Sequence, residues 1–139
     1  MVRRIGNTKA KGSRRERAIR DKAFDAGAVD VVKSGASLGP FDLVLIFPAR
    51  AALVQVKSNA WPGRVESGAL DVLAGELDSR LYRVITVRVD DGRGGKPVAY
   101  RVRIHNGPAV PRDECSWDEF IGALPAADAP RLVPGTAAR

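Results

Sequence analysis

Three polar residues interrupt two consecutive apolar segments, and their types and spacing suit a chemical site. Asp42 opens the run Leu43-Val44-Leu45-Ile46, and thirteen positions later Gln55 begins the triplet Gln55-Val56-Lys57 within the next apolar segment. Residues two apart on a strand project from the same face, so Gln55 and Lys57 would lie together, and a paired strand would bring Asp42 beside them. A carboxylate, an amide oxygen and an ammonium group that converge on a sheet could hold a divalent cation and hydrolyse a phosphodiester.

The same residues also have ordinary structural interpretations. Asp42 follows Gly39-Pro40-Phe41 and could be a turn or strand-entry residue, while Lys57 could end its strand with its ammonium group in water. Charges buried without partners destabilise a protein by several kcal/mol. Polar side chains that converge on a buried sheet are therefore expected only where they serve a function. These three residues alone leave both interpretations open.

The charge of the chain favours nucleic acid as a partner. The 139 residues include 23 Lys and Arg against 16 Asp and Glu, a net charge of +7. Residues 1–22 hold nine basic and two acidic residues, so the whole surplus lies at the amino end. Such a cluster attracts phosphates without regard to base sequence, although a solubilising tail has the same composition. The residues assigned to DNA contact from this segment are Lys9, Lys11, Arg14 and Arg15.

A metal ion bound by this chain would have oxygen ligands. The single cysteine, Cys115, and the single histidine, His105, exclude a multi-cysteine or paired-histidine zinc site, and both are interpreted as structural residues. Carboxylate, amide and backbone carbonyl oxygens are hard ligands that suit Mg²⁺ or Mn²⁺. We therefore expect Mg²⁺, or Mn²⁺ in its place, as the cofactor.

Periodicity predicts a mixed set of helices and strands. A flexible basic arm over 1–11 precedes a helix that begins at Ser13, which has Glu16 at capping-box spacing, and that ends at Gly27. A loop of turn residues covers 34–40, and the two site strands are joined by a tight connection around Pro48-Ala49-Arg50. The further elements expected are strands at 28–33, 83–89 and 98–105 and helices at 66–80 and 117–124, the last with Ser116 as its cap.

Length and composition predict one domain. We expect a single domain over 12–124 and a disordered tail over 125–139, which is rich in alanine and proline. In the strand at 98–105, Val98, Tyr100, Val102 and Ile104 should face the core, and the alternate residues, His105 included, should face solvent. No long apolar run or signal-peptide pattern occurs, so no membrane association is expected and the predicted location is the cytoplasm.

The order of the elements and four short motifs resemble the PD-(D/E)XK nuclease superfamily. Within it, the chain is similar to the archaeal-type Holliday junction resolvases, which also occur in some phages, so the cytoplasm would be that of a host if a phage encodes it. The resemblance covers roughly residues 12–105. The motifs are Gly12-Ser13-Arg14-Arg15-Glu16-Arg17, Lys33-Ser34-Gly35-Ala36-Ser37, Phe41-Asp42-Leu43 and Gln55-Val56-Lys57-Ser58.

The resemblance implies an α/β fold with a restriction-endonuclease-like core, in which helices flank a central mixed β-sheet of about five strands in the order αβββαβ. It implies metal ligation by Asp42, by the Gln55 side-chain oxygen, by the Val56 carbonyl and by Glu16, directly or through water. Lys57 would orient or deprotonate the attacking water and stabilise charge in the transition state. Phosphates beside the scissile one would be bound by Lys33, Ser34, Ser37 and Ser58.

Two positions depart from the superfamily pattern. Position 55 is Gln where Glu or Asp is usual, which removes one negative charge and should weaken metal binding. Position 41 is Phe where the name-giving motif has Pro, and Pro40 stands one residue earlier. Glu16 has a competing structural role, because it could cap its own helix or pair with Arg20.

The resulting hypothesis is a magnesium-dependent, structure-selective endodeoxyribonuclease that resolves four-way junctions by paired incisions. Because a four-way junction is two-fold symmetric, a resolvase of this size is expected to be a homodimer with two active sites. One alternative is a restriction or repair endonuclease of the same fold. The other is a catalytically silent DNA-binding module, which the glutamine at position 55 favours.

Overall fold

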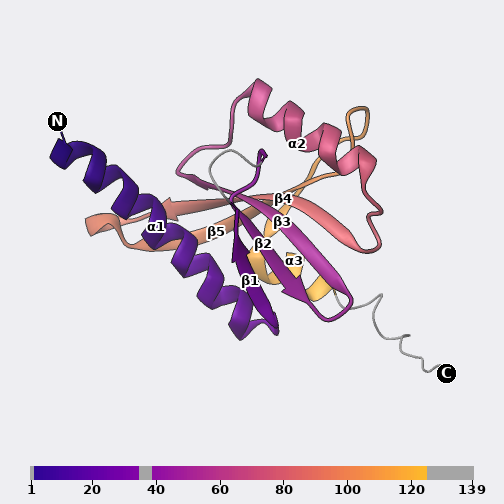
Figure 1. The fold of residues 1–139 in the computed structure, drawn as a ribbon, viewed down its shortest axis with the longest axis horizontal. Coiled ribbons are helices and arrows are strands. Elements are labelled where there is room, and N and C mark those ends of the chain that lie inside the picture. Colours follow the sequence, from indigo (N-terminus) through magenta and orange to yellow (C-terminus); the bar gives the residue numbers. More distant parts are fainter. Residues whose placement is uncertain (1, 35–38, 125–139) are drawn as a thin grey trace.

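The computed structural model describes residues 2–34 and 39–124, and it describes side chains from Arg14 onward. The expected disordered tail and Ser37 lie outside the described residues. Three α-helices, one short 3-10 helix and six strands make up the described chain (Figure 1). In chain order they are α1 (Val2–Asp25), β1 (Asp30–Lys33), β2 (Leu43–Phe47), β3 (Arg50–Ser58), α2 (Arg64–Glu76), β4 (Tyr82–Asp91), η1 (Arg93–Gly95), β5 (Pro97–His105), β6 (Asp113–Ser116) and α3 (Trp117–Ala123).

The strands form one mixed sheet in the order β1-β2-β3-β4-β5-β6. Strands β3 and β4 are parallel, and α2 makes the crossover that such a pair requires. The other neighbouring pairs are antiparallel. The expected α/β class with a mixed sheet is confirmed, with one strand more than expected. This strand, β6, has the sequence Asp-Glu-Cys-Ser, which shows no apolar alternation from which a strand could be predicted.

Helices cover both faces of the sheet. Ile19 and Ala23 of α1 and Trp117 and Phe120 of α3 belong to one apolar core with inward-facing strand residues such as Val54. Helix α2 lies across the other face, where Leu70 is fully buried (Figure 1). Both faces are therefore closed where the helices pack, as is usual for a sheet that contains parallel strands. No helix in the described part of the chain combines the length and apolar composition that crossing a bilayer requires.

Helix α1 begins at Val2 and not at Ser13, so the prediction of a flexible arm over 1–11 was wrong. The segment before Ser13 contains no proline, and its two arginines and two lysines are good helix formers, whereas Gly6 and Gly12 cost about 1 kcal/mol each. Ser13 therefore lies inside the helix and cannot cap its start. The helix-capping alternative for Glu16 is removed by the same observation.

The β2–β3 hairpin sets the register of the candidate site. The tight connection expected around Pro48-Ala49-Arg50 is present, and Ala49 turns the chain with a φ of 66°. Leu43, the first residue of β2, pairs with Val54, and the Asp42 amide just before it donates to the same Val54 carbonyl. The hairpin thus brings Asp42 to the part of β3 that carries Gln55, Val56 and Lys57.

The face assignment of β5 was wrong at Val98, which was expected in the core but is exposed, and at His105. His105 was expected in solvent, but it is 3% exposed, because α2 covers this end of the sheet. The predicted third helix is confirmed, and its Ser116 caps it in a capping box with Glu119. Helix α2 begins two residues before the predicted start and ends at Glu76.

Candidate functional site

Asp42 is held against strand β3 by both its backbone and its side chain. Its amide N donates to the Val54 carbonyl at 2.7 Å, and its own carbonyl accepts from the Ser34 amide at 2.8 Å. Its carboxylate Oδ2 accepts a hydrogen bond from the Val56 amide at 2.8 Å. Because Val56 lies between Gln55 and Lys57, the carboxylate is fixed at the centre of the triplet. The expectation that strand pairing brings Asp42 beside the triplet is confirmed.

Gln55 and Lys57 both contact Glu66, which lies in the first turn of α2. Gln55 Nε2 donates to Glu66 Oε2 at 3.4 Å. Lys57 Nζ lies 3.1 Å from Glu66 Oε1 and 3.4 Å from Oε2. Glu66 could not be assigned to the site from sequence, because an acidic residue in a first helical turn is ordinary and only the packing of α2 on the sheet brings it there.

Two oxygens of the predicted site are buried without a hydrogen-bond partner. Gln55 is 7% exposed, and its Oε1 accepts no hydrogen bond. Glu16 Oε1 is also buried and accepts none, although Lys33 Nζ lies 3.3 Å away. That distance makes an ion pair, but the angles do not make a hydrogen bond, so we treat the contact as a Coulomb attraction only. Buried oxygens without a donor cost about 1–3 kcal/mol each, and a bound cation would satisfy them.

Glu16 lies in a cleft between α1 and the β1–β2 edge of the sheet. The cleft has a volume of ≈ 270 Å³. Leu43, the neighbour of Asp42, lines it on the face that packs against α1, whereas Gln55 contacts Glu66 on the face that α2 covers. The Arg20 guanidinium lies 5.7 Å from the Phe24 ring centroid, so it has a partner on its own helix. The lining residues are Glu16, Arg17, Arg20, Val31, Lys33 and Leu43.

Arg15 and Ser58, both expected to contact DNA, are engaged inside the protein. Arg15 is 5% exposed and forms an ion pair with Asp91, while its Nε donates to the Ser58 hydroxyl. Asn59 closes this cluster by accepting from the Asp91 amide at 2.8 Å. These contacts join α1 to β3 and β4. Burial therefore removes from solvent the Arg15 guanidinium that was predicted to contact DNA.

The remaining predicted DNA contacts differ in their exposure. Arg14 and Lys33 are exposed, and Ser34 is half-buried. Lys9 and Lys11 lie on α1, but their side chains lie outside the described part of the chain.

Trp61 also lies beside the site and is packed between two cations. The guanidinium carbons of Arg88 and Arg103 lie 4.7 and 4.1 Å from its ring centroid. Both arginines belong to central strands on the face that carries α2. The half-buried ring therefore fills the space between the loop after β3 and the sheet.

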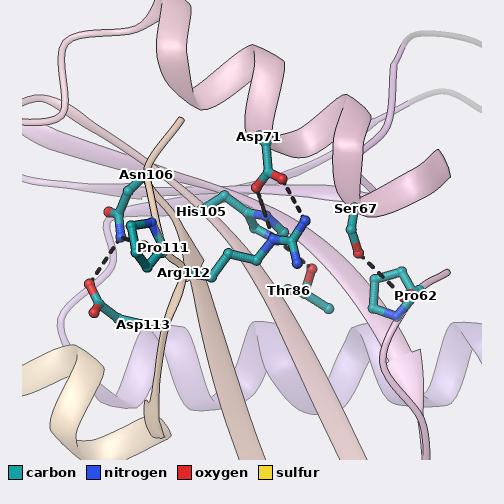
Figure 2. Close-up of polar contacts among 9 residues, drawn as sticks. All are labelled: Pro62, Ser67, Asp71, Thr86, His105, Asn106, Pro111, Arg112 and Asp113. Carbon is teal, nitrogen blue, oxygen red and sulfur yellow. Dashed lines mark hydrogen bonds and ion pairs between the residues drawn. The ribbon is translucent and has the colours of Figure 1, made fainter. Parts of the chain in front are cut away.

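A buried polar network attaches α2 to the sheet (Figure 2). His105 Nδ1 lies 2.8 Å from Asp71 Oδ1, and His105 Nε2 lies 3.0 Å from the Thr86 hydroxyl. Arg112 adds two hydrogen bonds to the Asp71 carboxylate, at 3.0 and 2.6 Å. A neutral imidazole with its proton on Nδ1 satisfies every partner, because Nε2 can then accept from Thr86. This network fixes α2, and Glu66 with it.

Burial lowers the pKa of His105, and this outweighs the opposing effect of the hydrogen bond to Asp71. Burial alone would raise the pKa of Asp71. The hydrogen bonds from Arg112 and His105 lower it by more, so the pKa of Asp71 lies below its usual value. Nearby Arg112 and Arg103 also disfavour a charged imidazole. The folded protein therefore favours neutral His105 beside an ionised Asp71.

The donor set fits a hard divalent cation. Among the described residues, no three His, Cys, Asp or Glu side chains gather into a ligand cluster. The set therefore depends on the Gln55 amide oxygen and the Val56 carbonyl as well as on Asp42, and all of these are oxygens that Mg²⁺ and Mn²⁺ accept. The buried, unpartnered Oε1 of Gln55 is the observation that favours the fit.

Comparison with known proteins gives no relative for this chain. No family model matches it, and neither a curated protein nor a solved structure shows a significant match. Any assignment of function therefore rests on the residues and geometry of the site itself.

The pH dependence of stability tests the neutral state of His105. Because folding lowers the pKa of His105 below 6.5, the unfolded chain binds the proton more readily, and stability should fall as pH decreases through 6.5. The titration of Asp71 changes the stability only near and below its usual pKa of 3.8, which lies outside a measuring window of about pH 5 to 8. Urea unfolding across this window should show the fall, and His105→Gln should abolish it and cost about 1–3 kcal/mol at the upper end. Since His105 is the single histidine, an equal slope in both proteins would refute this account.

Proposed function

We propose that the protein is a magnesium-dependent endodeoxyribonuclease with a restriction-endonuclease-like core. The observation that carries the proposal is the Asp42 carboxylate held by the amide of Val56, the residue between Gln55 and Lys57, at 2.8 Å. The element order supports it. An antiparallel β1-β2-β3 meander is followed by α2 and by β4 parallel to β3, which accords with the αβββαβ order that the resemblance implies.

The residues of the chain have separable tasks in phosphodiester hydrolysis. Asp42, the Gln55 amide oxygen and the Val56 carbonyl would hold the divalent cation. Glu16 would have to reach it from the α1 side of the sheet, opposite the face that carries Gln55. When bound, the cation neutralises charge on the phosphate oxygens and acidifies a water molecule. The Lys57 Nζ orients the attacking water or takes its proton, and it stabilises the negative charge that develops on the phosphate.

Helix α1 would supply the attraction to the DNA backbone. Arg14, Arg17 and Arg20 are exposed on it, and Arg17 and Arg20 line the cleft that holds Glu16. Because α1 is continuous from Val2, the basic residues before Arg14 extend from the same rigid element. Phosphate contacts of this kind hold the duplex without reading its sequence.

The preferred substrate within this function is a four-way DNA junction. This choice rests on the resemblance of the motifs to junction resolvases, and paired incision of a two-fold symmetric junction would require a homodimer. A restriction or repair endonuclease is the alternative within the same chemistry. Gln55 favours a further candidate, a DNA-binding module without activity, because a neutral side chain replaces a metal-binding carboxylate.

The variant Asp42→Asn tests the site. Losing this carboxylate should lower the rate of junction cleavage in Mg²⁺ at least about a hundredfold, since it removes a principal electrostatic contact to the cation. Junction binding, measured in chelator, should stay unchanged. Asp118→Asn, an exposed acid on α3, is the matched control and should cleave normally. Cleavage by Asp42→Asn at the control rate would exclude the assignment.

The salt dependence of binding tests the start of α1. Lys9→Gln combined with Lys11→Gln keeps helix-favouring residues but removes two cations. The slope of log binding constant against log salt should shrink by about 0.9 for each phosphate that the variant no longer neutralises. Lys96→Gln, in the exposed turn before β5, is the control. A slope equal to that of the control would show that these lysines do not contact phosphate.

A further inference from the structure

Glu66 is the carboxylate that contacts both Gln55 and Lys57, the first and last residues of the triplet, and the sequence motif does not include it. We propose that Glu66 serves as the second acidic ligand of the divalent-cation site and replaces the acid that position 55 lacks. This inference rests on the proposed function and names a further residue of the same site.

The contacts of Glu66 place its carboxylate where a cation ligand is needed. Oε2 lies 3.4 Å from Gln55 Nε2, and Oε1 lies 3.1 Å from Lys57 Nζ. The carboxylate therefore faces both residues that flank Val56, whose amide holds Asp42. Two acids, one on each side of the β3 triplet, would restore the charge of a site that has two acidic ligands.

The unpartnered oxygen of Gln55 independently indicates a ligand. Gln55 is 7% exposed, yet its Oε1 has no hydrogen-bond donor while its Nε2 faces Glu66. Buried polar atoms almost always have a hydrogen-bond partner, so a buried oxygen without one destabilises the folded protein. A cation bound at Oε1 would supply the missing partner, while Nε2 keeps its contact with the Glu66 carboxylate.

The ion pair between Lys57 and Glu66 is weak enough to be exchanged for a cation. The side chains are 32% and 49% exposed, and a pair so accessible to water contributes little stability. A divalent cation could therefore displace the ammonium group from Glu66. Lys57 would then be released toward the phosphate and the attacking water.

The start of α2 is held firmly enough to keep Glu66 in reach. The Ser67 hydroxyl donates to the Pro62 carbonyl at 3.2 Å, and the Ser67 amide donates to the Gly63 carbonyl at 2.9 Å (Figure 2). One turn further, Asp71 attaches the helix to the sheet through His105. An acid in the first turn would also stabilise the helix dipole, so the test must separate that role from metal ligation.

Calorimetric titration of the full chain with Mn²⁺, without DNA, tests the proposal. Glu66→Gln should weaken Mn²⁺ binding at least about tenfold, as Asp42→Asn should. Glu66→Asp keeps the charge at the helix start but shortens the reach, so it should also weaken binding. Glu66→Gln combined with Gln55→Glu returns the acid to the strand and should restore affinity. Glu76→Gln, an exposed acid at the other end of α2, should bind as the unaltered protein does.

The outcomes separate this inference from the proposed function. Unaltered Mn²⁺ affinity in Glu66→Gln, together with its loss in Asp42→Asn, would overturn the role of Glu66 and leave the site itself intact. Weakening by Glu66→Gln but not by Glu66→Asp would overturn it in favour of a helix-dipole effect. Equal weakening by Glu66→Gln and Glu76→Gln would overturn it in favour of a general charge effect. Absence of Mn²⁺ binding by the unaltered protein would overturn both the inference and the proposed function.

Discussion

The hydrogen bond from the Val56 amide to the Asp42 carboxylate is the interaction on which the rest of the site depends. It exists because β2 pairs with β3 in a register that brings the residue before Leu43 against Val54 and within reach of the Val56 amide. A slip of one residue would turn the inward-facing side chains of β2 to the other face and move Asp42 away from that amide. The buried set Leu43, Leu45 and Phe47, which must face α1 and α3, excludes that slip. Core packing therefore determines the chemistry of the opposite face.

Helix α2 contributes the second constraint. It closes the face that carries Gln55 and Lys57, and the Asp71, His105 and Arg112 network fixes it there. Since Glu66 lies in its first turn, a displacement of the helix would separate the carboxylate from both residues of the triplet. The polar network and the candidate cation site are thus coupled through one rigid element, although they lie at different positions along it.

The strands and the grouping of Asp42, Gln55 and Lys57 could be predicted from sequence because alternating apolar residues fix both strand faces and turn residues mark their ends. The start of α1 could not, because a basic segment with two glycines has no apolar stripe to distinguish a helix from an arm. The burial of Arg15 and His105 depends on partners 76 and 34 positions away, Asp91 and Asp71, which only the packed fold brings near. Glu66 was missed for the same reason.

Cleavage of labelled DNA by the purified protein, with Mg²⁺, with Mn²⁺ or with chelator, would show whether the residues around Asp42 form a nuclease site. The substrates are an immobile four-way junction, the matched linear duplex and the single strand. Our account predicts metal-dependent, symmetric paired nicks in the junction alone. Tight junction binding without any product in either metal would contradict the account and favour a silent DNA-binding module, and cutting of linear duplex would contradict the junction preference.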